Sequence, residues 1–569
     1  YNAAFESIFG CRNVSDVTIL SEKQEKQLDR FNETEAPYDY SKTVVELFME
    51  VAAKYPDQTA VVYQDVKYTY SEFEKITRKL AGALIHNGLK TGDVAAVLIP
   101  RCEYMAICSI GIARSGCACQ PLDHTYPQDR LHFMLEDSGA KLLITTQKMR
   151  ELVPDYTGKI LYLDEIPDLP EYTEKLPSPK PEDLFTLLYT SGSTGVPKGC
   201  MLEFGNITAF CIWYHKQYQL DSSSRMAAYA SYGFDASMMD IFTSLTAGAQ
   251  LNIIAEEIRL DLLALNNYFE ENEITHSFMT TQVGRQFAME IESKTLKYLS
   301  TGGEKLVPLN PPEGIRFYNA YGPTECTVYT TLFEVDRYYD DIPIGKPLDN
   351  LKLYIVDDKG HRLPAGASGE LLVSGRQVSR GYLNRPEKTK EVYAKNPYTD
   401  KEGYERMYHT GDVVRCLNDG NISFVGRRDA QVKIRGFRIE LTEVEEVIRR
   451  FPGIKDATVA AFDEESGGKY IAAYVVSDDQ IDINKLNAFI METKPPYMVP
   501  AVTMQIDRIP LNQNQKVNKR ALPKPQKAVE EMIPPKNEMQ ERICDCIAEA
   551  IGHREFGITT DIQFAGLTS

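Results

Sequence analysis

The most constraining feature of the sequence is a regular alternation of amphipathic, helix-like stretches with short apolar runs. Residues 44–54 and 71–86 have helical periodicity, and they alternate with apolar runs at 60–63 and 94–99. Strands that are separated by helices favour a doubly wound α/β arrangement with helices on both faces of the sheet. The run 94–99 is nearly all apolar, which is typical of a strand that is buried on both faces.

The alternation continues through further apolar runs at 184–190, 250–254, 298–301 and 317–319. Strand-like alternation with glycine-rich turns from 352 to 382 predicts a β-rich subdomain within the same body. A helix at 442–451 and strands at 457–462 and 470–476 then indicate a small α+β domain, and a helix at 538–551 follows four prolines. We therefore expect residues 1–40 to precede a large α/β body at 41–427, followed by a small domain at 428–522, a linker at 523–536 and the start of a helical domain at 537–569.

Composition limits the partners of the chain. The 569 residues include 43% hydrophobic and 25% charged residues, which is typical of a soluble globular protein. The net charge of −18 repels polyanions, so nucleic acid and anionic membranes are excluded as expected partners. No apolar run approaches the length of about 20 residues that a membrane span needs, and we expect a cytoplasmic protein.

The cysteines and histidines predict no structural metal site. The 11 cysteines include the pairs Cys117/Cys119 and Cys544/Cys546, whose spacing matches neither a zinc knuckle nor a redox pair. The eight histidines contain no HExxH pattern. Reduced thiols in cores and at the surface are the simplest interpretation.

A glycine- and hydroxyl-rich loop at 189–199 (YTSGSTGVPKG) follows a predicted buried strand. Backbone N–H groups, hydroxyls and one lysine can together surround polyphosphate oxygens. The loop is not a Walker loop, because no Gly-Lys-Ser/Thr stands four residues after a glycine. On its own such a stretch is more often a solvated linker.

Four further motifs follow in order. They are NAYGPTE at 319–325, YHTGD at 408–412, GRRD with QVKIRG at 426–436, and PL with NQKVN at 510–518. With this set the chain closely resembles the adenylate-forming superfamily, and specifically the adenylation domains of nonribosomal peptide synthetases, over about residues 20–525. The resemblance implies a large α/β adenylate-forming body of several subdomains, a smaller mobile α+β C-terminal domain, and then the beginning of a helical carrier domain.

The resemblance implies that ATP and an amino acid react at a site that also holds Mg²⁺. Lys516 would bridge the substrate carboxylate and the α-phosphate, Glu325 would be the magnesium-side carboxylate, and Thr190 would assist catalysis. Tyr321 would stack on adenine, while Asp412 and Arg427 would bind the ribose. The full set implied for ATP or AMP is Thr190, Ser191, Gly192, Ser193, Thr194, Gly195, Lys198, Gly302, Asn319, Tyr321, Gly322, Thr324, Asp412 and Arg427.

Two positions depart from the family pattern near this lysine. The usual Asn-Gly-Lys is Asn514-Gln515-Lys516 here, and the usual aspartate two residues later is Asn518. The lysine is retained, but the loop that positions it differs in sequence.

The resemblance also implies the substrate pocket. Asp235 would pair with the substrate ammonium and Lys516 with its carboxylate, and the side-chain pocket would consist of Ala236, Met239, Phe278, Leu299, Thr301, Ala320, Val328 and Tyr329. None of these eight wall residues is ionisable near neutral pH, so a charged substrate side chain would be buried there without a partner. We expect a neutral, hydrophobic, branched aliphatic L-amino acid, although the hydroxyls of Thr301 and Tyr329 could contact a polar group.

The remaining implications concern movement and partners. Asp429 corresponds to the family hinge, although it could instead pair with a neighbouring arginine. Rotation about it would bring residues 431–436 to the substrate for thioester formation.

Ser569, at the end of FAGLTS, corresponds to the attachment site of 4'-phosphopantetheine on a carrier domain in cis. Residues 17–35 resemble the connector after a condensation domain, which implies that 1–40 are such a connector and that an upstream condensation domain is an expected partner. A small helper protein is a further expected partner.

Two other functions remain open from the sequence. An acyl- or aryl-CoA ligase of the same superfamily would share the nucleotide motifs, but the aspartate in Phe234-Asp235-Ala236-Ser237 suits an amino acid better than a fatty acid. A catalytically silent scaffold that docks carrier domains would have no need of Lys516, Glu325 and Asp412.

Overall fold

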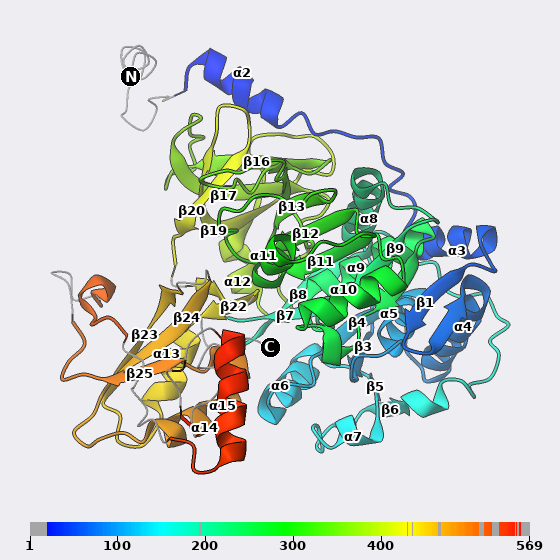
Figure 1. Ribbon diagram of the computed structural model, residues 1–569. Helices are drawn as coiled ribbons and strands as arrows, with labels where there is room; N and C mark the ends of the chain where they lie inside the picture. The colour runs from blue at the N-terminus through cyan, green and yellow to red at the C-terminus, as the bar shows by residue number, and fades with distance from the viewer. Residues whose placement is uncertain are drawn as a thin grey trace.

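Two sheets of the large body have helices between them (Figure 1). The computed structural model describes residues 20–192, 196–429, 431–434, 436–464, 468–510, 517–525, 534–551, 554, 557 and 558. One sheet has six strands, in spatial order β6 (Lys159–Tyr162), β5 (Leu142–Thr145), β3 (Val94–Leu98), β4 (Ala118–Leu122), β7 (Leu184–Thr190) and β8 (Lys198–Glu203). The pair β7–β8 is antiparallel and the other pairs are parallel, as the alternation of elements predicts.

The second sheet has nine strands. Their spatial order is β15 (Lys346–Pro347), β14 (Thr331–Glu334), β13 (Arg316–Tyr321), β12 (Tyr298–Gly302), β11 (His276–Thr280), β9 (Arg225–Ala228), β10 (Gln250–Ile253), β1 (Thr59–Tyr63) and β2 (Val66–Thr69). The central strands are parallel, and antiparallel strands lie at both edges. The carboxyl ends of β11, β12 and β13 therefore meet at one edge of the sheet.

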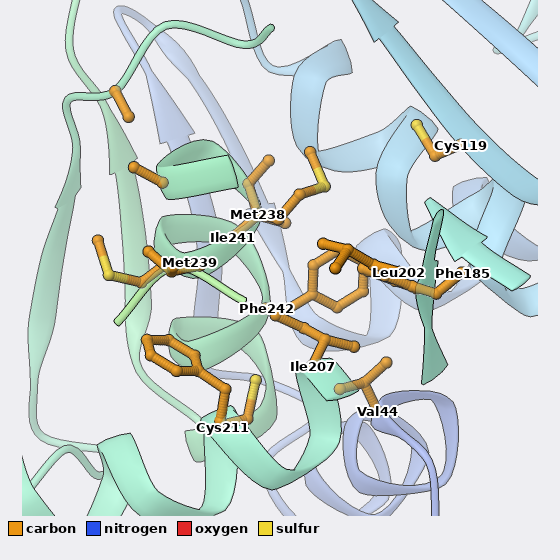
Figure 2. Close-up of a cluster of buried hydrophobic side chains, with 14 of the residues drawn as sticks. Val44, Cys119, Phe185, Leu202, Ile207, Cys211, Met238, Met239, Ile241 and Phe242 are labelled. Carbon is orange, nitrogen blue, oxygen red and sulfur yellow. The ribbon is translucent and has the colours of Figure 1, made fainter. Parts of the chain in front are cut away.

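Helices α8 (Phe204–Tyr218) and α9 (Asp235–Ala247) help to form the main core between the sheets (Figure 2). Phe242 of α9 packs edge-on against Phe185 of β7, with ring centroids 4.8 Å apart. The other helices of this body are α3 (Val44–Lys54), α4 (Tyr70–His86), α5 (Tyr104–Arg114), α6 (Gln128–Ser138), α7 (Gln147–Arg150), α10 (Leu262–Glu271) and α11 (Thr281–Glu290). The helices predicted at 44–54 and 71–86 are thus confirmed, and all five residues of β3 are buried as predicted.

A second core lies on the other face of the nine-stranded sheet. It contains Phe269 of α10, Phe287 of α11, Leu299 of β12 and Phe317 of β13. The adjacent Tyr298 and Tyr318 belong instead to the main core, because successive side chains of a strand point to opposite faces.

The predicted β-rich subdomain is confirmed and is longer than expected. Its sheet has the order β16 (Leu351–Val356), β17 (Ser368–Gly375), β19 (Arg406–Cys416) and β18 (Tyr393–Lys395), and β20 (Ile422–Arg427) also pairs with β19. Helix α12 (Pro386–Val392) precedes β18. The sheet therefore extends well past the expected end at residue 382.

The small domain begins with a hairpin of β21 (Gln431–Ile434) and β22 (Phe437–Glu440). Its other elements are α13 (Leu441–Arg449), β23 (Asp456–Asp463), β24 (Lys469–Val476), α14 (Ile483–Thr493) and β25 (Val502–Gln505). The predicted helix and two strands are confirmed, whereas β25, which pairs in parallel with β24, was not anticipated. Helix α15 (Glu538–Ile551) agrees with the last predicted helix, and no helix within the described ranges is long and apolar enough to span a membrane.

Residues 20–40 are bonded to the β-rich sheet. Helix α2 (Glu22–Phe31) lies beside this sheet at the top of Figure 1. The buried Asn32 side chain makes two hydrogen bonds of 2.8 Å with the backbone N–H and C=O of Leu353. The Asn350 backbone N–H donates to Thr34 O at 2.8 Å. The segment before the predicted boundary at residue 41 is therefore hydrogen-bonded to the large body at β16.

Candidate active site

A cavity of about 720 Å³ lies between the ends of several large-body strands and the β21–β22 hairpin of the small domain. Its volume is within the range of about 300–1,000 Å³ that is usual for ligand sites. Many residues predicted for nucleotide and substrate line it, namely Thr190, Ser191, Asp235, Ala236, Phe278, Gly302, Ala320, Gly322, Thr324, Val328, Tyr329, Asp412 and Arg427. The motifs far apart in the sequence thus meet around one cavity.

The residues predicted to bind adenosine form one hydrogen-bonded group. The Tyr321 hydroxyl donates to Asp412 Oδ2, and Arg427 Nη1 donates to Asp412 Oδ1. Asp412 and Arg427 are cross-strand neighbours on β19 and β20, which explains their contact. Burial raises the pKa of Tyr321, and the Asp412 carboxylate raises it further. The hydroxyl is therefore a protonated donor at neutral pH.

Arg427 also binds the predicted hinge residue. Its Nε and Nη2 each lie 2.8 Å from a different carboxylate oxygen of Asp429. Burial raises the pKa of Asp429, but this two-point contact outweighs it and holds the pKa below its usual value. Pairing with a neighbouring arginine, the alternative that the sequence left open, thus occurs in this arrangement.

Glu325 lies in a turn directly after β13 and is fully buried. Arg438 Nη1, from the small domain, lies 3.1 Å from Oε1 and 3.0 Å from Oε2 of this carboxylate. The Tyr382 hydroxyl donates to Oε1 at 2.5 Å, and Lys198 Nζ lies 3.6 Å from the same oxygen. Burial alone raises the pKa of Glu325, but Arg438, Lys198 and Tyr382 together lower it to about 2. The carboxylate is therefore ionised and its charge is compensated.

The same cluster affects Lys198. Burial, assisted by the nearby positive charge of Arg438, lowers the pKa of Lys198 to about 8 although Glu325 opposes the shift. Lys198 Nζ also donates to the Tyr382 hydroxyl at 3.0 Å. Lys198, Glu325 and Tyr382 thus form one buried cluster, and none of the three is among the described residues that line the cavity.

Glu325 does not fit a bound magnesium ion in this arrangement. Both of its oxygens contact Arg438, and Mg²⁺ requires direct oxygen ligands at about 2.0–2.1 Å. Within the described ranges, no group of three or more His, Cys, Asp and Glu side chains is placed to hold a metal ion. A metal at Glu325 would require Arg438 to leave.

Asp235 begins α9 and faces the cavity. Its Oδ2 accepts a hydrogen bond of 2.7 Å from the Thr324 hydroxyl. Burial raises the pKa of Asp235, and burial lowers the pKa of the nearby Lys433. Lys433 comes from β21, lines the same cavity and lies 5.6 Å from the Tyr321 ring. A cation of the small domain therefore shares the site with the predicted ammonium-binding carboxylate.

Only some of the residues predicted to surround the substrate side chain line the cavity. Ala236, Phe278, Ala320, Val328 and Tyr329 line the cavity, whereas Met239, Leu299 and Thr301 do not. Met239 is fully buried on α9, in the core that Figure 2 shows.

Leu299 and Thr301 of β12 lie outside the cavity for the same reason. Leu299 packs in the second core, and Thr301 lies against Gly284 of α11 on that face. Cross-strand pairing instead puts Ser300 beside Phe278 and Gly302 beside Ala320. A shift of one residue moves a side chain to the other face of a strand, so the sequence assignment selected the wrong face of β12.

Other predicted residues have structural roles. The Asn319 side chain donates to Pro343 O at 2.8 Å and is buried. A Cβ at Gly192 would lie 2.1 Å from Val196 O, and one at Gly322 would lie 2.2 Å from Val328 O, so both turns need glycine. Thr190 Oγ1 is buried without a hydrogen-bond partner among the described residues. Ser193, Thr194, Gly195, Lys516 and Ser569 lie outside the described residues.

The small domain contacts the site through its hairpin. The Ser191 hydroxyl donates to Arg438 O at 2.6 Å, and the Gly436 N–H donates to Glu304 Oε1 at 2.7 Å. The Phe437 ring meets Phe234 edge-on at 4.9 Å. Lys433 and Gly436, which belong to the segment that the resemblance associates with thioester formation, line the cavity here.

Sequence reasoning did not assign roles to Lys433, Tyr382 and Arg438. Lys433 and Arg438 stand in or beside the QVKIRG motif, so cations in that motif were the available signal. Tyr382 lies on no motif, and its place between Lys198 and Glu325 depends on tertiary structure.

Comparison with known proteins agrees with these observations. Residues 48–383 match the family described as AMP-binding enzyme, and residues 443–516 match the AMP-binding enzyme C-terminal domain. The chain is 36% identical to Bacitracin synthase 1 of Bacillus licheniformis and 37% identical to Surfactin synthase subunit 1 of Bacillus subtilis, over 96% and 97% of its length. It spans 10% and 16% of those two proteins.

The fold resembles that of an artificially fused adenylation–PCP di-domain NRPS from Klebsiella oxytoca. The TM-score is 0.73 at 23% identity, over 82% of this chain and 94% of that chain. The family match covers more than half of the chain, and the two relatives match nearly all of it. The chain therefore belongs to the AMP-binding enzyme family.

Proposed function

We propose that this chain activates a neutral, hydrophobic, branched aliphatic L-amino acid as an aminoacyl-AMP. The activated acyl group would then pass as a thioester to the 4'-phosphopantetheine arm on Ser569 of a carrier domain. An upstream condensation domain and a small helper protein remain expected partners. The proposal rests on the family membership and on the composition of the cavity.

One observation supports this class of substrate: Asp235 lies in the cavity beside uncharged side chains. Its carboxylate faces the cavity with Thr324 as a hydrogen-bond donor, and Phe278 and Val328 line the same space. An aspartate there can pair with a substrate ammonium, while the wall offers no partner to a charged side chain. Burying such a charge unpaired would cost several kcal/mol, which supports exclusion of Asp, Glu, Lys and Arg.

The first half-reaction would join the substrate carboxylate oxygen to the α-phosphorus of ATP and release pyrophosphate. Asp235 would orient the amino group, and Asp412 would hold the ribose hydroxyls once Tyr321 turns to the adenine. Lys516 would contribute positive charge where the carboxylate and phosphate meet. In the second half-reaction a thiol sulfur would bond to the acyl carbon and AMP would leave.

A CoA ligase is the main alternative, and the aspartate at residue 235 argues against it, because a fatty acid has no ammonium for it to bind. A pyrophosphate-exchange panel with all common amino acids and several fatty acids tests the choice. We expect the highest exchange with leucine, isoleucine or valine. The highest exchange with a charged amino acid or a fatty acid would contradict the proposal.

Two variants test the roles of individual residues. Asp235→Asn should lower exchange by about 100-fold with ATP affinity unchanged, because the ammonium loses its counter-charge. The control Asp261→Asn alters an exposed helix cap that asparagine also forms well, and it should behave like the wild type. Ser569→Ala should keep exchange and lose covalent loading with radiolabelled amino acid.

A further inference from the structure

The small domain is attached to the site by a buried ion pair between Arg438 and Glu325. Glu325 has no exposed surface, and the Arg438 side chain is 17% exposed. The same Arg438 residue accepts a hydrogen bond from Ser191 through its backbone carbonyl. The side chain and the backbone of one residue therefore attach β22 to two different motifs of the large body.

The ion pair occupies the oxygens that a metal would need. Arg438 Nη1 is within 3.1 Å of both oxygens of Glu325, and the Tyr382 hydroxyl also donates to Oε1. A magnesium ion on either oxygen would lie within a few ångströms of the guanidinium in a buried site. Two like charges in such a site repel strongly, so the two cations cannot both stay.

We propose that Arg438 and Mg²⁺ are mutually exclusive partners of Glu325, so that a metal ion at this carboxylate releases the β21–β22 hairpin from the cavity. This inference rests on the proposed function, because metal binding at Glu325 belongs to that proposal. Arg438 is a positioning residue in this scheme: it holds the hairpin in place of the metal and performs no chemical step.

The contacts of the hairpin make the release cooperative. Gly436 is bonded to Glu304, and Phe437 packs against Phe234. Gly436 has φ +81° and lies so close to Gly303 that a Cβ on Gly303 would be 3.2 Å from its Cα. These close contacts leave little room for Arg438 to move alone, so its departure should carry Gly436 and Phe437 with it.

Competition between Arg438 and the metal fixes the direction in which the affinity for the metal–nucleotide complex changes when Arg438 is removed. If Arg438 and the metal compete, removing Arg438 must strengthen metal–nucleotide binding, because the competing state is lost. If Arg438 instead contacts the nucleotide phosphates directly, its removal must weaken binding. The two accounts therefore predict opposite changes in affinity.

The first experiment is hydrogen–deuterium exchange on the full chain. Without ligand, Arg438→Gln should raise amide exchange in residues 436–440 by about tenfold or more, because a buried charge has lost its partner. The control Arg450→Gln removes an exposed arginine of the same domain and should leave this exchange unchanged. Unchanged protection in Arg438→Gln would overturn the inference.

The second part adds ligands to the wild type. MgCl₂ with α,β-methylene-ATP should raise exchange in residues 436–440, whereas the nucleotide with EDTA should raise it far less. An equal rise with EDTA would assign the release to the nucleotide alone and overturn the inference.

Calorimetry completes the test. The Mg²⁺ complex of α,β-methylene-ATP should bind Arg438→Gln about tenfold more tightly than the wild type, and Arg450→Gln like the wild type. Equal or weaker binding to Arg438→Gln would overturn the inference while leaving the proposed function intact. Absence of binding to the wild type would overturn the proposed function and, with it, the competition at Glu325.

Discussion

Arg427 holds Asp412 with one guanidinium nitrogen and Asp429 with the other two. The first aspartate is on β19 of the large body, and the second precedes the small-domain hairpin. One side chain thus connects the predicted ribose-binding carboxylate with the predicted hinge. Any movement of the small domain about Asp429 must act on this connection.

We predict that Asp429→Ala slows covalent loading more than pyrophosphate exchange. Loss of the ion pair should destabilise the arrangement in which Lys433 and Gly436 lie at the cavity, by about 1 kcal/mol or about fivefold in population. Single-turnover loading and steady-state exchange would be measured side by side. Asp358→Ala, which removes an exposed partner of Arg428, is the control. Equal losses in both half-reactions would argue against a hinge role.

Phe278 and Leu299 should respond differently to truncation, because they lie on opposite faces of the sheet. Phe278→Ala enlarges the cavity and should increase exchange with phenylalanine or tryptophan relative to leucine. Leu299→Ala should lower the free energy of unfolding by about 2–5 kcal/mol and leave the order of substrates unchanged. Exchange panels and urea denaturation of both variants would decide. A changed substrate order in Leu299→Ala would return that residue to the pocket wall.

Lys516→Ala should lose adenylation while nucleotide binding persists. The lysine is proposed to contact carboxylate and phosphate together, so its charge matters most as they react, and the loss should be about 100-fold or more. Exchange assays and nucleotide calorimetry would separate the two effects. Lys524→Ala, which changes an exposed lysine close to Lys516 in the sequence, should retain full exchange. Exchange at the wild-type rate in Lys516→Ala would remove Lys516 from the mechanism.

Stability should fall in mild acid because of two buried histidines. Burial lowers the pKa of His215 and of His276 from 6.5 to about 4. Between these values the unfolded chain binds protons that the folded chain does not, so the free energy of unfolding decreases as pH falls through this window. Denaturation midpoints at about pH 7.5 and about pH 5 would be compared. His215→Gln should reduce the difference, while His361→Gln, at an exposed site, should not.

The sequence was sufficient for the fold class and for much of the site, because strand and helix periods are local and the motifs end adjacent parallel strands. Asp412 and Arg427 could be assigned to one ligand group before their contact was known. The face of β12 could not be fixed, since Leu299 and Ser300 differ by one residue and the strand pairing decides between them. The contact of Arg438 with Glu325 joins positions 113 residues apart in the sequence, and no local pattern encodes it.

The bonds between residues 32–36 and β16 affect where this unit can be joined to other modules. A chimera fused at residue 40 would supply a foreign segment in place of Asn32, and the Leu353 N–H and C=O would lose their buried partners. A junction before Ser21 would keep the helix cap, the Asn32 contacts and the Thr34 contact with Asn350 together. Exchanged modules should therefore carry their own connector helix with them.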